Sequence, residues 1–399
     1  MNRYLIAAIT LCLYISLIPA TPAVAEDGTD QPLRVKVFGI GESRSRYYRI
    51  PAICTTNSGT LIAVADKRGA SINDLPNTIS VVAKRSTDGG ATWSEAITLA
   101  RGDKATGKTY GDPAIVCDRN TGALICVFVG DKGFFENPTS ATDRQNIYYV
   151  KSVDDGMTWS EPMSISDQIH QDGWYGAFCA SGAGFQDSQG RIMFVANCRT
   201  TPAADTAGVY EYLVHTDDLG KTWHVANPDG KDPQGGFGNE SKVVELADGE
   251  LLMSMRYGHQ RRFMKSGDRG ATWSEPYEAT QLIEPIDGMG CNGDIIRYPM
   301  ANGKSVLLHS ITACQAARRD VSVSVSYDEG KTWPVTRRIV DGPSAYSSLT
   351  VLPDGSIGCF VEDGTGAEAR SAGGYDLYFV RFPLHWLTAV SYTHLRAHE

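Results

Sequence analysis

The sequence predicts an all-β protein, a six-bladed β-propeller made of four-stranded antiparallel blades. The main evidence is an eight-residue frame, Ser/Thr-x-Asp-x-Gly-x-Thr-Trp, which occurs five times, at residues 86–93, 152–159, 216–223, 266–273 and 326–333. Each copy follows an alternating apolar run, which is typical of a strand that enters a hairpin turn. The copies recur about every sixty residues without any helical heptad pattern, so each copy is expected to mark one blade.

The repeated frame has the chemistry of a turn. Its aspartates are expected to accept hydrogen bonds from backbone N–H groups a residue or two further on, and they are Asp88, Asp154, Asp218, Asp268 and Asp328. The glycine two positions after each aspartate tolerates a positive φ. The Thr-Trp pair is expected to place a large aromatic ring between neighbouring hairpins. Such turns indicate a fold and leave the function open.

The two ends of the predicted propeller are expected to share one blade. Residues 33–38 and 376–382 are plausible first and last strands, and their pairing would remove two sheet edges at once. Six blades of about sixty residues would occupy residues 32–387 as a single domain, with one blade that lacks a recognisable frame.

The composition fits a turn-rich globular protein, because 42% of the 399 residues are hydrophobic and 21% are charged. A net charge of −9 without a long basic run argues against a nucleic-acid partner. The histidines are scattered without ligand spacing, so no metal and no cofactor is expected. The eight cysteines after Cys12 lie mostly in apolar runs; we interpret them as small buried residues, although export would permit disulfides. A monomer is expected.

Residues 1–25 have the pattern of a secretory signal peptide. A charged start leads into an apolar run, and Ala23-Val-Ala25 satisfies the small-x-small rule before a cleavage point. A membrane anchor is the alternative, but the run is short for a span and is broken by Pro19 and Pro22. We therefore expect a protein without stable membrane insertion, exported to the periplasm or outside the cell. Residues 389–399 lack a strand pattern and are expected to be a disordered or non-native tail.

Three short segments carry a resemblance to a known family. Residues 48–51 read Tyr-Arg-Ile-Pro, residues 239–241 read Asn-Glu-Ser before a clean strand, and residues 345–347 read Ala-Tyr-Ser. Together with the five frames they resemble the Asp-box sialidases (neuraminidases), in particular the bacterial exo-sialidases of glycoside hydrolase family 33, over residues 33–387. The resemblance implies the sialidase fold and a retaining exo-α-sialidase that removes terminal sialic acids from glycoproteins, glycolipids and oligosaccharides.

The resemblance also implies three catalytic side chains. Tyr346 matches the nucleophile, Glu240 matches the base that takes its proton, and Asp74 matches the general acid/base. A phenol suits this role because the anomeric carbon of sialic acid bears a carboxylate, which would repel a carboxylate nucleophile. Asp74 lies in an Asn-Asp-Leu-Pro loop, where an aspartate is by default a turn former.

Arginines are implied for substrate binding, because a planar guanidinium meets both oxygens of a carboxylate. Arg49, Arg256 and Arg318 match the three that bind the sialic acid carboxylate, and the neighbouring Arg319 leaves the third assignment open.

Three further positions are implied by the same resemblance. Arg68 matches an arginine that contacts the substrate, and Glu362 matches a glutamate that supports Arg49 from behind. Asp112, in a Gly-Asp-Pro-Ala loop before the strand at residues 115–117, would accept a hydrogen bond from a sugar hydroxyl, and a simple turn is equally consistent.

Three other functions remain open. A non-catalytic sialic-acid-binding propeller would keep the arginines but would not need Asp74, Glu240 and Tyr346 together. A trans-sialidase would use the same chemistry with a sugar in place of water. An Asp-box propeller that acts on neutral glycans would bind with paired carboxylates and aromatic platforms.

Overall fold

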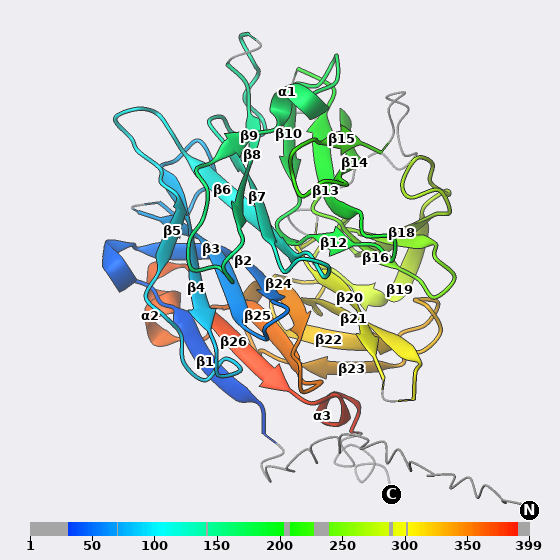
Figure 1. Cartoon of the computed structure of the whole chain (residues 1–399). Coiled ribbons are helices and arrows are strands. Elements are labelled where there is room, and N and C mark those ends of the chain that lie inside the picture. Colours follow the sequence, from blue (N-terminus) through cyan, green and yellow to red (C-terminus); the bar gives the residue numbers. More distant parts are fainter. Residues whose placement is uncertain are drawn as a thin grey trace, which may run out of the picture. The chain divides into compact units, whose positions relative to one another are not determined.

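A computed structural model gives the fold of the chain, which divides into two units, residues 1–30 and 31–399. The structure describes residues 31–69, 71–140, 143–202, 208–226, 239–286, 290–300 and 302–389. The expected signal peptide at residues 1–25 therefore lies outside the described residues, as does the expected tail apart from Ala389. The described strands of the second unit form six small sheets, which confirms the predicted six-bladed β-propeller (Figure 1).

In each blade consecutive strands pair in antiparallel fashion. The first blade contains β2 (Tyr47–Thr55), β3 (Leu61–Arg68), β4 (Ile79–Ser86) and β5 (Ile97–Ala100). The second contains β6 (Tyr110–Cys117), β7 (Leu124–Gly130), β8 (Asn146–Ser152) and β9 (Met163–Ser164), with β11 (Gly182–Ala183) parallel to β6. The third contains β10 (Gly176–Cys179), β13 (Ile192–Arg199), β14 (Val209–Thr216) and β15 (His224–Val225), with β12 (Phe185–Gln186) beside β13.

The other three blades follow the same plan. The fourth contains β16 (Lys242–Glu245), β17 (Leu251–Met255), β18 (Gln260–Ser266) and β19 (Tyr277–Ile283). The fifth contains β20 (Asp294–Pro299), β21 (Ser305–Thr312), β22 (Val321–Ser326) and β23 (Val335–Arg338). The sixth contains β24 (Ser344–Val351), β25 (Ile357–Asp363), β26 (Asp376–Phe382) and β1 (Leu33–Phe38). The helices are short: η1 (Glu42–Arg44), α1 (Ser166–Ile169), α2 (Ala367–Ala372) and α3 (Leu384–Thr388).

The ring of blades is closed by the two ends of the domain. Strand β1 pairs with β26, from Leu33 opposite Arg381 to Phe38 opposite Leu377, and Figure 1 shows the blue strand beside the red one. This confirms the predicted shared blade. Strand contacts run from blade to blade around the ring, through the pairs β24 with β2, β2 with β6, β6 with β10, β13 with β16, β16 with β20, and β20 with β24.

The tryptophans of the repeated frame fill the seams between blades, as expected. Trp93 packs edge-on against Phe379 of the sixth blade at a ring-centroid distance of 5.5 Å. Trp223 packs with a tilted ring on Tyr149 of the second blade at 5.4 Å. Gly90 has a φ of 91°, and a Cβ there would lie 2.1 Å from the Phe379 ring. Only glycine fits at this position, because the neighbouring blade approaches the turn so closely.

The hydrogen bonds of the frame differ from the expectation. The carboxylate of Asp88 accepts from the backbone N–H of Thr92 at 2.9 Å and from its hydroxyl at 2.6 Å, which lies four residues on and not one or two. Ser86 completes the turn by donating to Asp88 and accepting from the N–H of Gly90. The other four frames repeat these bonds. The carboxylate therefore spans the whole turn.

Strand direction decides which residues meet at each end of the ring. In the first blade Tyr47, at the start of the first strand, lies opposite Arg68 at the end of the second, and Arg68 lies opposite Ile79 at the start of the third. The repeated frames follow the third strands, so they lie at the other end. Side chains near the starts of first strands and the ends of second strands therefore gather away from the frames.

Most of the described cysteines are buried, as expected. Six of the eight cysteines that the structure describes are buried, and Cys117 and Cys314 are partly exposed. Within the same residues, no helix has the length and apolar character required to cross a membrane.

Candidate active site

A cavity of about 490 Å³ lies at the end of the ring away from the repeated frames. Seven of the nine site residues expected from the sequence line it, and they are Arg49, Asp74, Asp112, Glu240, Arg256, Arg318 and Tyr346. The other two, Arg68 and Glu362, are fully buried behind its wall. Residues far apart in the sequence are thus brought to one hollow by strand ends from five blades.

Local irregularities in three first strands direct side chains into this cavity. The pairing register shifts after Arg49 in β2, after Gly111 in β6 and after Ser344 in β24. A β-bulge leaves an extra residue unpaired and changes the direction of the side chains next to it. Asp112 lies inside one of these bulges with a φ of 56°, so the expected loop at residues 111–114 is instead an irregular part of β6.

Three guanidinium groups surround the ring of Tyr346. Their central carbons lie 5.3 Å (Arg49), 5.9 Å (Arg256) and 5.7 Å (Arg318) from the ring centroid. Arg319, the alternative to Arg318, binds the carboxylate of Asp320 at 3.0 Å and does not line the cavity. The arrangement concentrates positive charge at the floor of the cavity. An anion bound there would interact with it more strongly than in bulk water.

Glu362 holds one of these arginines and the tyrosine together. Its carboxylate accepts from Arg49 Nε at 2.6 Å and Nη2 at 3.2 Å, and from the backbone N–H groups of Ile50 at 2.9 Å and Tyr346 at 3.1 Å. Burial opposes the charge on Arg49, but the adjacent carboxylate outweighs it and raises the pKa of Arg49 well above its ordinary value. Arg49 is therefore a permanent cation in a fixed position.

Glu240 and Arg256 flank the hydroxyl of Tyr346. Arg256 Nη1 donates to Tyr346 Oη at 3.0 Å and also binds Glu240, whose other oxygen accepts from Ser181 Oγ at 2.9 Å. Burial alone would raise the pKa of Glu240, but Arg256 and a hydrogen bond from Tyr346 reverse this and leave the pKa below its ordinary value. Burial, together with Glu240, raises the pKa of Tyr346 well above its ordinary value. At neutral pH the pair thus consists of a carboxylate and a neutral phenol.

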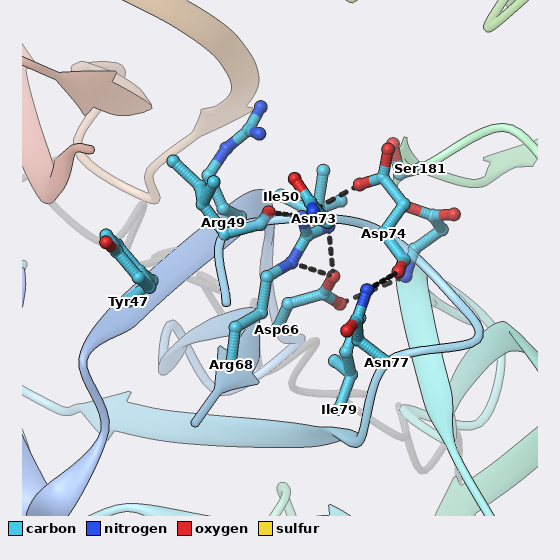
Figure 2. Close-up of polar contacts among 12 residues, drawn as sticks. Tyr47, Arg49, Ile50, Asp66, Arg68, Asn73, Asp74, Asn77, Ile79 and Ser181 are labelled. Atoms are coloured by element: carbon cyan, nitrogen blue, oxygen red, sulfur yellow. Dashed lines mark hydrogen bonds and ion pairs between the residues drawn. The ribbon is translucent and has the colours of Figure 1, made fainter. Parts of the chain in front are cut away.

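The acidic loop, residues 71–77 with Asp74, is tied to Arg68, as Figure 2 shows. Asp74 forms an ion pair with Arg68 Nη1 at 2.8 Å, and its side chain is 74% exposed. Arg68 itself is only 1% exposed and binds Asp66 at 2.8 Å. Asp66 is absent from the residues expected from the sequence, because nothing in an Asp-Lys-Arg strand end distinguishes a buried acid from an exposed one.

Sequence reasoning also missed an apolar side of the cavity. Phe134, Phe135 and Phe178 line it, and the ring centroids of Phe135 and Phe178 both lie 5.1 Å from that of Phe134. Phe135 is 52% exposed, which is unusual for such a large apolar side chain. The only sequence signal was two adjacent phenylalanines in an otherwise polar loop.

Known proteins resemble this chain in sequence and in fold. The family described as BNR repeat-like domain matches residues 59–359. The sialidase of Micromonospora viridifaciens is 32% identical over 392 residues, which cover 93% of this chain and 56% of that protein. The chain thus spans little more than half the length of this relative. The Hadza microbial sialidase Hz136 has a similar structure, with a TM-score of 0.77, 28% identity, and coverage of 89% of this chain and 69% of that chain.

A more distant structure shares the fold. The intramolecular trans-sialidase from Ruminococcus gnavus, in complex with oseltamivir carboxylate, matches with a TM-score of 0.74 at 18% identity. The match covers 89% of this chain and 98% of that one.

Proposed function

The chain belongs to the BNR repeat-like family, within the Asp-box sialidase superfamily, and from this premise we propose that it is an exo-α-sialidase. In this proposal it hydrolyses terminal sialic acids from glycoproteins, glycolipids and oligosaccharides. The supporting observation is the convergence of three guanidinium groups on one tyrosine whose hydroxyl lies beside a carboxylate. The signal-like sequence at residues 1–25 supports the further proposal that the protein acts in the periplasm or outside the cell.

The arginines account for the choice of an acidic sugar. Moving a carboxylate from water into a cavity costs free energy unless fixed cations and hydrogen bonds replace its hydration. Arg49, Arg256 and Arg318 would supply them on the side of the sugar that faces Tyr346. A neutral sugar in the same place would offer these guanidinium groups no negative charge, so it would bind poorly.

The first half of the proposed reaction forms a covalent intermediate. Tyr346 Oη attacks C2 of the sialic acid while its proton passes to Glu240. The bond between C2 and the glycosidic oxygen breaks, and that oxygen takes the proton of the Asp74 carboxylic acid. Glu240 is needed because the raised pKa of Tyr346 makes an unassisted phenolate scarce at neutral pH.

The second half releases the sugar. The Asp74 carboxylate takes a proton from a water molecule, whose oxygen attacks C2. The bond between C2 and Tyr346 Oη breaks, and the phenolate recovers its proton from Glu240. Two displacements at one carbon give net retention of configuration. A sugar hydroxyl in place of water would make the same site a trans-sialidase, and product analysis in the presence of lactose separates the two activities.

One set of assays tests the proposal. The wild-type protein should release a fluorophore from an aryl α-sialoside and not from the same aryl glycoside of a neutral sugar. Tyr346→Phe should lose most turnover, whereas Tyr298→Phe should retain it. Tyr298 is a matched control because it is also 8% exposed and loses one hydrogen bond, that to Gly355 O, but it lies outside the cavity. Full hydrolysis by Tyr346→Phe would refute the assignment, and NMR of the first released anomer tests retention.

A further inference from the structure

Asp66 is a fully buried acid that connects two walls of the cavity. It lies near the end of β3 with no exposed surface. One oxygen accepts from Arg68 Nε at 3.1 Å and Nη2 at 2.8 Å, and the other accepts from the backbone N–H of Asp112 in β6 at 3.0 Å. These bonds fix the guanidinium of Arg68 and also the strained backbone of Asp112.

Arg68 in turn holds the acidic loop in place. Its remaining terminal nitrogen, Nη1, binds the carbonyl oxygen of Ile72 and pairs with Asp74 Oδ1 at 2.8 Å. Figure 2 shows Asp66 and Asp74 on opposite sides of the same guanidinium. The loop is thus held at its backbone and at its acidic side chain by a group that solvent hardly reaches.

The charges around Asp66 explain why it needs this arginine. Burial is the main influence, and it raises the pKa of Asp66 to about 6, while Arg68 and the N–H of Asp112 act in the opposite direction. The charged groups that act on Asp66 and Arg68 come from four places along the chain, namely Arg49, Asp74, Asp112 and the pair itself. Asp66, Asp74 and Asp112 therefore all act on the same buried cation, Arg68. A change at Asp66 alters the interactions of Arg68 with the other two acids.

We propose that Asp66 is a positioning residue for protonation of the leaving group: by fixing Arg68, it sets the place of Asp74 relative to the glycosidic oxygen. This inference rests on the proposed function. In the step concerned, the bond between C2 and the glycosidic oxygen breaks and the proton moves from Asp74 to that oxygen. Asp66 neither touches the substrate nor exchanges a proton in this step.

Leaving-group dependence distinguishes this role from a merely structural one. An aryloxide departs with little help from an acid, whereas the alkoxide of a sugar needs a proton, and general acid catalysis contributes about 10²–10⁴-fold. The quantity to measure is kcat/KM, since it reports the steps up to the first cleavage. The probes are an aryl α-sialoside and sialyllactose.

Asp66→Asn should reduce kcat/KM for sialyllactose at least about tenfold more than for the aryl glycoside. The amide keeps the size of the side chain. Its NH₂ group is a donor, however, and it would face either the guanidinium of Arg68 or the backbone N–H of Asp112, which are donors as well. The matched control is Asp187→Asn, because Asp187 is also buried and binds one arginine, Arg269, and backbone N–H groups, but it does not line the cavity. Its ratio between the two substrates should stay at the wild-type value.

Each outcome decides between the two proposals. Hydrolysis of neither substrate by the wild-type protein would reject the proposed function itself. An equal loss on both substrates in Asp66→Asn, or no loss on either, would overturn the positioning role while leaving the function intact. If circular dichroism shows that Asp66→Asn does not fold, Arg68→Lys takes its place. It leaves Asp66 with its bond to Asp112, but a single ammonium cannot replace the fork that binds Asp66 and Asp74 together, so the same selective loss is expected.

Discussion

Replacing Glu362 by glutamine should be among the most damaging isosteric changes in this protein. The carboxylate accepts four hydrogen bonds, two from Arg49 and one each from the N–H groups of Ile50 and Tyr346. Glutamine offers one acceptor oxygen, and its NH₂ group would point at donors. The side chain of Arg49 is 12% exposed, so it would remain as a buried charge without a counterion. Breaking a buried ion pair in this way costs about 3–5 kcal/mol.

Urea denaturation of the wild type and the variant measures this cost, from the transition midpoint and the slope. The matched control is Glu329→Gln. Glu329 also pairs with an arginine, Arg297, through both oxygens, but the side chains of that pair are 24% and 32% exposed. Solvent reduces the contribution of such a pair to about 0–1 kcal/mol. If the two variants lose the same stability, or if Glu362→Gln loses less than about 1 kcal/mol, burial does not give this ion pair its importance.

Two further changes test the floor of the cavity. Arg318→Ala should raise the KM for a sialoside about 10- to 100-fold, because a charged hydrogen bond contributes about 1.5–3 kcal/mol. In Arg319→Ala the KM should stay within about twofold of the wild-type value. Steady-state kinetics that gave the opposite order would move the assignment by one residue. Lys242→Met should shift the acidic limb of the pH profile of kcat/KM upward, because the charge of Lys242 is among those that lower the pKa of Glu240. Glu240 must be ionised to accept a proton, so activity at low pH should fall first, and an unchanged profile would show that Lys242 does not act on this acid.

The fold was predictable from the sequence because the repeated frame is a local structure. The bonds between Asp88 and Thr92 span four residues, so the pattern that makes the turn is visible in any one copy. The arginine cluster was predictable for a different reason. Arg49 and Tyr346 lie in short motifs, and those motifs mark first strands whose ends meet in a propeller.

What sequence reasoning missed depends on contacts between distant segments. Asp66 is buried because the N–H of Asp112 and the side chain of Arg68 close over it, and the strand containing Asp66 reads like any other. The bulge at Asp112 depends on pairing with β7, so a Gly-Asp-Pro segment alone cannot be told from a loop. Phe134 lines the cavity and contacts Phe178 from another blade, and no local pattern indicates that contact.

The pairing of β1 with β26 has a consequence for how the protein matures. The blade that it completes also carries Tyr346 on β24 and Glu362 on β25. Among the described strands β1 comes first along the chain and β26 comes last, so this sheet cannot be complete before β26 has been synthesised. Until β26 pairs with β25 and β1, the sheet that carries Tyr346 and Glu362 is incomplete. The geometry of the cavity around Tyr346 is therefore tied to completion of the domain.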